Sequence, residues 1–182
     1  MPKTTNQKEQ IVKAALKLFA THGYGSASVR QIAKAARVSP ALMYNYFNSK
    51  EDVLKEIVSR GFDDIKKSLE VYNDEIPARK AIEIHINATV AIIQKNSEFW
   101  RLLHSIRLQE KVLDASKKLF EEIVRFITKT FTSIFKKLNY RNPHLEAILF
   151  LTQVDGLVIL YLQNPKLQIR QLANHLITSY KR

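Results

Sequence analysis

The chain has 182 residues, enough for a core in one or two domains, and a net charge of +12. It has no cysteine, which excludes disulfides and thiolate metal sites, and its four glycines and five prolines are too few for the tight turns of an all-β protein. No apolar run approaches the roughly 20 residues of a membrane span, and the polar N-terminal residues lack a signal-peptide core. A cytoplasmic location is therefore expected.

The positive charge is concentrated near the N-terminus. Residues 1–50 contain eight lysines and arginines and one acidic residue, Glu9, so this segment supplies +7 of the net charge. Such a segment favours nucleic acid as a partner, and the alternative is a diffuse basic surface that only aids solubility.

The first of three short helices is expected after Asn6, which forms a capping-box pattern with Glu9. Apolar residues then recur at helical spacing on one face: Ile11, Ala15, Leu18 and Phe19. Gly23 and Gly25 are expected to end this helix.

The next two helices are joined by a turn at Arg37, Val38 and Ser39. Ser28 caps the second helix and Ser39 the third, where Pro40 costs nothing because the first N–H has no intrahelical partner. The predicted inner face is Val29, Ile32, Ala33, Ala36, Val38, Met43 and Phe47. Two short helices joined by a tight turn on a basic segment are typical of a helix-turn-helix that binds DNA.

The side chains left on the outer face suit contacts to DNA. Tyr44 offers a ring to a thymine methyl group, Asn45 a donor–acceptor pair to adenine, and Arg30 a bidentate contact to guanine. The side chains suited to phosphate are Ser28, Tyr46 and Lys50, the last at a helix N-terminus. The alternative for Arg30 is a solvated side chain, and the alternative for Tyr46 is packing beside the core.

The rest of the chain predicts about six longer helices. Their expected ranges, opened by a capping box at Ser49–Asp52, are 50–72, 78–95, 97 to about 106, 113–138, 144–162 and 164–180. We therefore expect an all-α fold, with a three-helix helix-turn-helix DNA-binding domain over residues 1–48. A roughly six-helix effector-binding and dimerisation domain follows over residues 49–182. The third helix runs almost directly into the fourth, so the two domains should be mechanically linked.

Large apolar residues with a few polar ones among them favour a ligand cavity in the second domain. Its candidate lining is Phe62, His85, Phe99, Trp100, Leu103, His104, Arg107, Phe126 and Gln153. The alternative is that the aromatic side chains form core and that His104 and Arg107 are solvated. The five histidines show no metal-ligand spacing, so neither a metal nor a cofactor is expected.

The helix predicted over residues 144–162 is apolar almost all round, which exceeds one core-facing stripe. Gly156 inside it suggests close approach of another helix, because a mid-helix glycine costs about 1 kcal/mol relative to alanine. With the last helix it favours a four-helix dimer interface formed by Ile148, Leu151, Asp155, Gly156, Ile159, Leu172 and Leu176. The alternative is a single buried central helix.

One further set of residues over about positions 8–55 carries a family resemblance. It consists of Ile11, Ala15, Leu18, Phe19, Gly23, Tyr24, Ser28, Val29, Ile32, Ala33, Ala36, Val38, Ser39, Tyr44, Tyr46, Phe47, Ser49–Asp52 and Leu54. In these residues the chain resembles the TetR family of bacterial transcriptional regulators. The resemblance implies a homodimer that binds a palindromic operator and leaves it when a small molecule occupies the C-terminal domain. By position, it implies base contacts from Arg30, Pro40, Ala41, Tyr44 and Asn45, and phosphate contacts from Ser28, Leu42 through its backbone, Tyr46 and Lys50.

The turn and the tip of the third helix depart from the family pattern. Arg37 stands where the family usually has a glycine, at a position that often needs a positive φ and costs other residues about 1 kcal/mol. Either Arg37 accepts the strain and gains a phosphate contact, or the turn differs. Pro40, Ala41 and Leu42 replace a more polar run, so apolar contact and DNA shape should carry more of the discrimination. Arg37 and Ser39 complete the predicted DNA-binding set.

The predicted function is a DNA-binding transcriptional regulator, in particular a repressor released by a small molecule. The alternatives are a regulator without an effector, its core filled, and an activator. An enzyme is not expected, because the sequence has no nucleophile–base constellation, metal-ligand spacing or Gly-rich phosphate loop. The expected partners are double-stranded operator DNA, an unknown small-molecule effector and a second copy of the chain, with no membrane.

Overall fold

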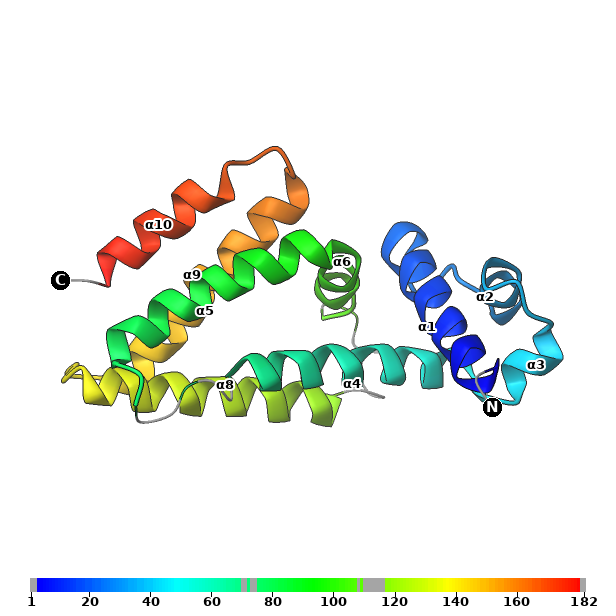
Figure 1. Cartoon of the computed structure of the whole chain (residues 1–182), viewed down its shortest axis with the longest axis horizontal. Helices are drawn as coiled ribbons and strands as arrows, with labels where there is room; N and C mark the ends of the chain where they lie inside the picture. The colour runs from blue at the N-terminus through cyan, green and yellow to red at the C-terminus, as the bar shows by residue number, and fades with distance from the viewer. Residues whose placement is uncertain (1–2, 70–71, 73–74, 108, 110–116, 181–182) are drawn as a thin grey trace. The chain divides into compact units, whose positions relative to one another are not determined.

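The computed structural model describes residues 3–69, 72, 75–107, 109 and 117–180, without the side chains of residues 3–6, 64 and 68. Over these residues it contains α-helices and no strand (Figure 1), which confirms the predicted all-α fold. The helices are α1 (Lys3–His22), α2 (Val29–Ala35), α3 (Pro40–Tyr44), α4 (Lys50–Leu69), α5 (Ala78–Lys95), α6 (Ser97–Ile106), α8 (Lys117–Lys137), α9 (Pro143–Gln163) and α10 (Ile169–Ser179).

The chain divides into two compact units. The first consists of Met1–Asp63 and Glu98–Lys118, and the second of Asp64–Ser97 and Leu119–Arg182. α4 begins in the first unit and ends in the second, so the backbone of one helix continues from one unit to the other. The predicted functional boundary between residues 48 and 49 lies inside the first unit and stays a prediction.

Side-chain caps place the starts of α2 and α3 where the sequence predicts them. Ser28 Oγ accepts a hydrogen bond from the Gln31 N–H at 3.3 Å, and the Gln31 side chain accepts one from the Ser28 N–H at 2.8 Å. Ser39 Oγ accepts a hydrogen bond from the Leu42 N–H at 3.1 Å, with Pro40 as the first helical residue. Each cap of this kind is worth about 1 kcal/mol.

Two helix ends in the first half of the chain differ from the predictions. α1 begins at Lys3, so Asn6 lies inside the helix and does not cap it. α4 ends at Leu69 and not at residue 72. The predicted start of the helix at residue 113 lies outside the described residues.

The start of α10 also differs from the prediction. The Asn164 carbonyl accepts a hydrogen bond from the Leu167 N–H at 2.9 Å, and the Asn164 side chain accepts one from the Lys166 N–H at 3.2 Å. These bonds make a turn, because an asparagine side chain can satisfy its own following backbone. The helix therefore begins at Ile169 and not at Asn164.

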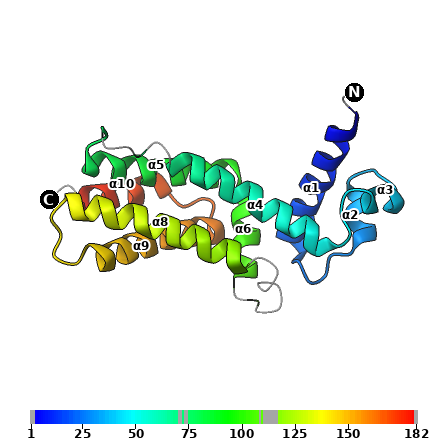
Figure 2. The same cartoon turned by 90° about the horizontal axis from the view of Figure 1, so that it is seen from below.

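In the first unit, α1 packs against α2, and α2 against α3 (Figures 1 and 2). Most of the predicted inner face is buried, namely Ile32, Ala33, Ala36, Met43 and Phe47. Val29 and Val38, predicted with them, are half-buried. Tyr24 packs edge-on against Phe19 of α1, with ring centroids 5.0 Å apart.

The first unit also contains a close contact between α4 and α6. A Cβ built on Gly61 would come within 2.0 Å of the Phe99 ring. Phe99 is 4% exposed, so its surroundings hold the ring in place. Gly61 is therefore required for packing, because no larger side chain fits under the ring.

In the second unit, α5 packs against both α9 and α10 (Figures 1 and 2). The core is an aromatic cluster in which the ring centroids of Phe131 and Phe150 lie 4.7 Å apart, and that of His85 lies 4.6 Å from Phe131. Burial lowers the pKa of His85 to about 4, so this imidazole is neutral at pH 7 and acts as a core side chain.

α9 is apolar on more than its core-facing side. By length and composition alone it could cross a membrane, so the prediction that no run approaches this length is wrong. Its buried face consists of Ala147, Phe150, Val154, Val158 and Leu162. Its exposed apolar side chains are Leu145, Ile148, Leu149, Ile159 and Leu160. Because only 28% of the apolar window is buried, α9 is not a buried central helix of this chain.

Gly61→Ala is expected to destabilise the first unit by about 1–3 kcal/mol. The added methyl group overlaps the Phe99 ring, and this strain outweighs the gain in helix propensity of about 1 kcal/mol. Urea unfolding followed by circular dichroism measures the change. In the double variant with Phe99→Leu, the two losses should be less than additive, and strict additivity would contradict direct contact.

Candidate nucleic-acid interface

The turn between α2 and α3 has a left-handed residue at its centre. Arg37 has a φ of 57° and its N–H donates to the Lys34 carbonyl at 3.2 Å. The Val38 N–H donates to the Ala33 carbonyl at 3.0 Å. These bonds form a Schellman motif, whose left-handed position glycine usually occupies. Of the two predicted alternatives, the structure has the one in which Arg37 accepts the strain, about 1 kcal/mol.

The outer surface of α2 and α3 presents the residues predicted to contact bases. We call this surface the reading face, and it comprises Arg30, Pro40, Ala41, Tyr44 and Asn45, all of them exposed. Tyr44 is 53% exposed, which is high for an aromatic side chain. The structure therefore separates the buried apolar inner face from an exposed outer face that carries Arg30, Tyr44 and Asn45 beside Pro40 and Ala41, as the sequence pattern predicts.

Lys50, predicted to contact phosphate, has partners inside the chain. Its Nζ donates to the carbonyls of Tyr24 and Ala27, each at 3.2 Å, and to that of Gly25 at 3.4 Å. The ammonium group also lies 4.5 Å from the centroid of the Tyr24 ring, within cation–π range. Lys50 therefore joins the start of α4 to the loop between α1 and α2. Sequence spacing gave no signal for this role, because the partners lie more than 20 residues away.

The neighbouring residue strengthens the same connection. The Tyr24 hydroxyl donates to Glu51 Oε1 at 2.8 Å. Burial and this hydrogen bond raise the pKa of Tyr24. Burial also acts to raise the pKa of Glu51, but hydrogen bonds from its own backbone, Tyr24 and Ser49, with the charge of Lys50, outweigh it and lower the pKa. At neutral pH the pair is thus a protonated phenol donating to a carboxylate.

Three other residues predicted to contact phosphate also have partners in the chain. Ser28 Oγ lies in the capping box of α2, and the Tyr46 hydroxyl donates to Gln7 Oε1 at 3.3 Å. The Leu42 N–H, predicted to contact phosphate through the backbone, is engaged by the Ser39 cap. Leu42 and Tyr46 are half-buried, so each contributes to packing.

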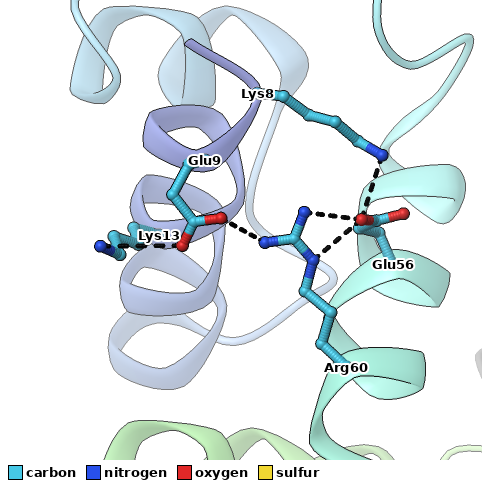
Figure 3. A network of polar contacts seen from close by, with 5 residues as sticks. All are labelled: Lys8, Glu9, Lys13, Glu56 and Arg60. Atoms are coloured by element: carbon cyan, nitrogen blue, oxygen red, sulfur yellow. Dashed lines mark hydrogen bonds and ion pairs between the residues drawn. The ribbon is translucent and has the colours of Figure 1, made fainter. Parts of the chain in front are cut away.

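A second polar connection joins α1 to α4 (Figure 3). The Arg60 guanidinium binds the Glu9 carboxylate of α1 and lies 2.7 Å from Glu56 Oε1 on its own helix. Lys8 reaches Glu56 at 3.1 Å, and Lys13 lies 3.6 Å from Glu9. Burial acts to raise the pKa of Glu56, but Arg60 and Lys8 outweigh it and lower the pKa. Sequence analysis missed this network, because α1 and α4 are separated by two other helices.

The predicted pocket residues are divided between the two units. The first unit holds Phe62, Phe99, Trp100, Leu103, His104 and Arg107, and the second holds His85, Phe126 and Gln153. Phe62, Phe99 and Leu103 are buried, which fits the alternative that such side chains form core. Gln153 accepts a hydrogen bond from the Tyr180 hydroxyl at 2.8 Å. Whether these residues line a common cavity stays a prediction.

The second unit contains a hollow of about 330 Å³ between the start of α5 and α8. Of the predicted pocket residues, its lining includes Phe126. Within the described part of the chain, no group of three or more histidine, aspartate or glutamate side chains is arranged to hold a metal ion.

Comparison with known sequences identifies the helix-turn-helix segment. Residues 11–57 match the model of the bacterial regulatory proteins of the tetR family. The transcriptional regulator HbdR of Aromatoleum sp. (strain CIB) is 41% identical over 71 residues, which cover 39% of this chain and 28% of HbdR. The regulator YuxN of Bacillus subtilis (strain 168) is 28% identical over 162 residues, or 86% of this chain and 54% of YuxN. The chain thus spans about half or less of the length of these curated relatives.

Solved structures share the fold over nearly the whole chain. The fatty acid degradation regulator FadR from Bacillus halodurans superposes with a TM-score of 0.77 at 21% identity, covering 96% of this chain and 94% of FadR. NalD of Pseudomonas aeruginosa, the secondary repressor of the MexAB-OprM multidrug efflux pump, gives 0.79 at 18% identity, covering 100% and 97%.

The fold and the N-terminal segment define the class: an all-α protein whose N-terminal end carries a helix-turn-helix of the kind found in bacterial transcriptional regulators. Residues 11–57 are therefore a helix-turn-helix segment of the kind found in the tetR family of bacterial regulatory proteins.

Lys50→Met is expected to destabilise the first unit by about 1–2 kcal/mol, because three carbonyls lose a charged donor at a partly solvated site. Thermal unfolding at neutral pH measures the loss. Lys55→Met is the matched control, since Lys55 is exposed and makes one ion pair at 3.9 Å to Asp52. Its effect should stay within about 0.5 kcal/mol. Equal losses in the two variants would argue against a structural role for Lys50.

Proposed function

We propose that the chain is a repressor that binds a palindromic DNA operator as a homodimer and is released by a small molecule. The observation that carries the DNA-binding part is the reading face. It is exposed, it lies on a capped pair of helices, and it belongs to a segment that supplies +7 of the net charge. Polar and aromatic side chains on a rigid cationic support match the requirements of the major groove.

The reading face suits particular contacts. The N-terminal end of α3 would enter the major groove, where Tyr44 can contact a thymine methyl group and Asn45 an adenine edge. Arg30, at the start of α2, can reach guanine. A phosphate contact from Arg37 would compensate for its left-handed backbone. Pro40 and Ala41 offer only apolar contact, so part of the specificity would come from DNA shape.

The homodimer is supported by the exposed apolar surface of α9 and α10. Of the residues proposed for the interface, Ile148, Ile159 and Leu172 are between 37% and 43% exposed. The other proposed members, Leu151, Asp155, Gly156 and Leu176, are half-buried. A Cβ on Gly156 would meet nothing within 4 Å, so no contact inside the chain explains a glycine there. A second helix crossing at this point would explain it.

Release by a small molecule is the finer part of the proposal. Two polar connections join α4 to the helix-turn-helix within the first unit, and α4 continues into the second. An effector that favours a conformation of α4 unsuited to DNA needs a coupling of only about 1–3 kcal/mol. NalD, which shares the fold, is a repressor, and this favours repression over activation. A regulator without an effector and an activator are the competing candidates, and the effect of added small molecules on DNA affinity separates them.

The salt dependence of DNA binding tests the interface. An operator selected from a random duplex library provides the probe, and fluorescence anisotropy provides the affinity. Tyr44→Ala should weaken specific binding by about tenfold with an unchanged salt slope, because it removes a base contact and no charge. Arg37→Gly should lower the slope of log K against log salt by about one, because one phosphate contact is lost. Lys136→Gln on α8 should change neither quantity. A slope near zero for the parent protein would refute the proposed surface.

Gly156→Phe should convert the dimer to a monomer without unfolding it. A Cβ at this position meets nothing within 4 Å in the described part of the single chain, whereas a phenylalanine ring would block a closely crossing helix. Size-exclusion chromatography with light scattering measures the mass, and circular dichroism checks the helices. Gly156→Ala is the control, and it should keep the dimer if the approach leaves room for a methyl group. A Gly156→Phe variant that remains dimeric would place the interface elsewhere.

A further inference from the structure

The hollow of the second unit combines a stripe of α8 with the segment that leads into α5. On α8 its lining residues recur every three or four positions, so they share one face: Phe126, Lys129, Thr130, Ser133 and Lys137, with Ile134 beside them. The opposite wall is Tyr72, Ile76, Ala78 and Ala81. At about 330 Å³ it lies at the lower end of the range for ligand pockets, so it suits a small molecule and not a polymer.

The lining of the hollow has an apolar part and a positively charged part. Isoleucine and alanine side chains, with the ring of Phe126, provide an apolar surface. Phe126 is 39% exposed, and an aromatic ring that is left partly in water gains from an apolar cover. Lys129 and Lys137 add positive charge to the same lining, and none of the described lining residues carries a carboxylate. This combination matches a molecule with an apolar body and one negative charge.

We propose that this hollow binds a small organic carboxylate, with its apolar body against Phe126, Ile76 and Ala81 and its charge held by Lys129 and Lys137. The sequence analysis did not predict this site, and it shares only Phe126 with the predicted pocket. That such a ligand changes DNA affinity rests on the proposed function, whereas the binding itself does not.

An NMR titration of the full ¹⁵N-labelled chain tests the proposal, with 4-phenylbutanoate as the probe and 4-phenylbutanamide as its uncharged match. Saturable shifts are expected in residues 76–81 and 126–137, with a Kd of about 1 mM or tighter. The amide should bind about tenfold more weakly, because it lacks the charge. No saturable binding, shifts confined to other residues, or equal binding of acid and amide would each overturn the proposal.

Matched variants locate the charge and the cavity. Lys129→Gln should weaken binding of the acid about tenfold and that of the amide little, whereas Lys136→Gln, outside the lining, should change neither. Ser133→Phe should fill the hollow and abolish binding at an unchanged melting temperature, whereas Ser133→Ala should preserve binding. Full binding by folded Ser133→Phe would overturn the site.

A parallel measurement of DNA affinity with and without the acid separates the two proposals. Binding in the hollow without a change in DNA affinity supports the site and counts against its effector role. Loss of DNA affinity with shifts elsewhere supports release and counts against this hollow.

Discussion

The ammonium group of Lys50 is the interaction on which the first unit most depends. It donates to three backbone carbonyls, those of Tyr24, Gly25 and Ala27, all in the loop between α1 and α2. Glu51, the next residue, accepts from the Tyr24 hydroxyl. The first turn of α4 therefore fixes the loop that precedes α2. Because α2 and α3 follow this loop, it also helps to set their position.

The ion-pair network of Lys8, Glu9, Glu56 and Arg60 adds a second point of attachment two turns further along α4. Each pair is partly exposed, so its contribution to the free energy of unfolding is small and falls with salt. The network matters because it fixes the position of α1 against α4. Together the two attachments hold α1 and the loop that follows it against the first half of α4.

The parts of this arrangement that the sequence predicted are those whose causes are local. Ser28 and Ser39 cap their helices through donors three residues away. For Arg37 the sequence left two alternatives, and the structure has the left-handed one. The internal contacts of Lys50 were not predicted, because a lysine at a helix start carries the same local signal whether it binds phosphate or backbone carbonyls. Contacts between Gly61 and Phe99, or Arg60 and Glu9, require knowing which helices meet, and no residue spacing encodes that.

Gly61 and Gly156 carry the same signal in the sequence but have different explanations in the structure. Each lies inside a long helix, where glycine costs about 1 kcal/mol, so each calls for a reason. For Gly61 the reason lies inside the chain, because the Phe99 ring occupies the place of a side chain. For Gly156 the space is open, and the apolar side chains around it on α9 are exposed. The cost of Gly156 therefore has no compensation inside the part of the chain that the structure describes. The proposed homodimer would supply it, because a two-fold axis would bring the same glycine from both helices to one crossing.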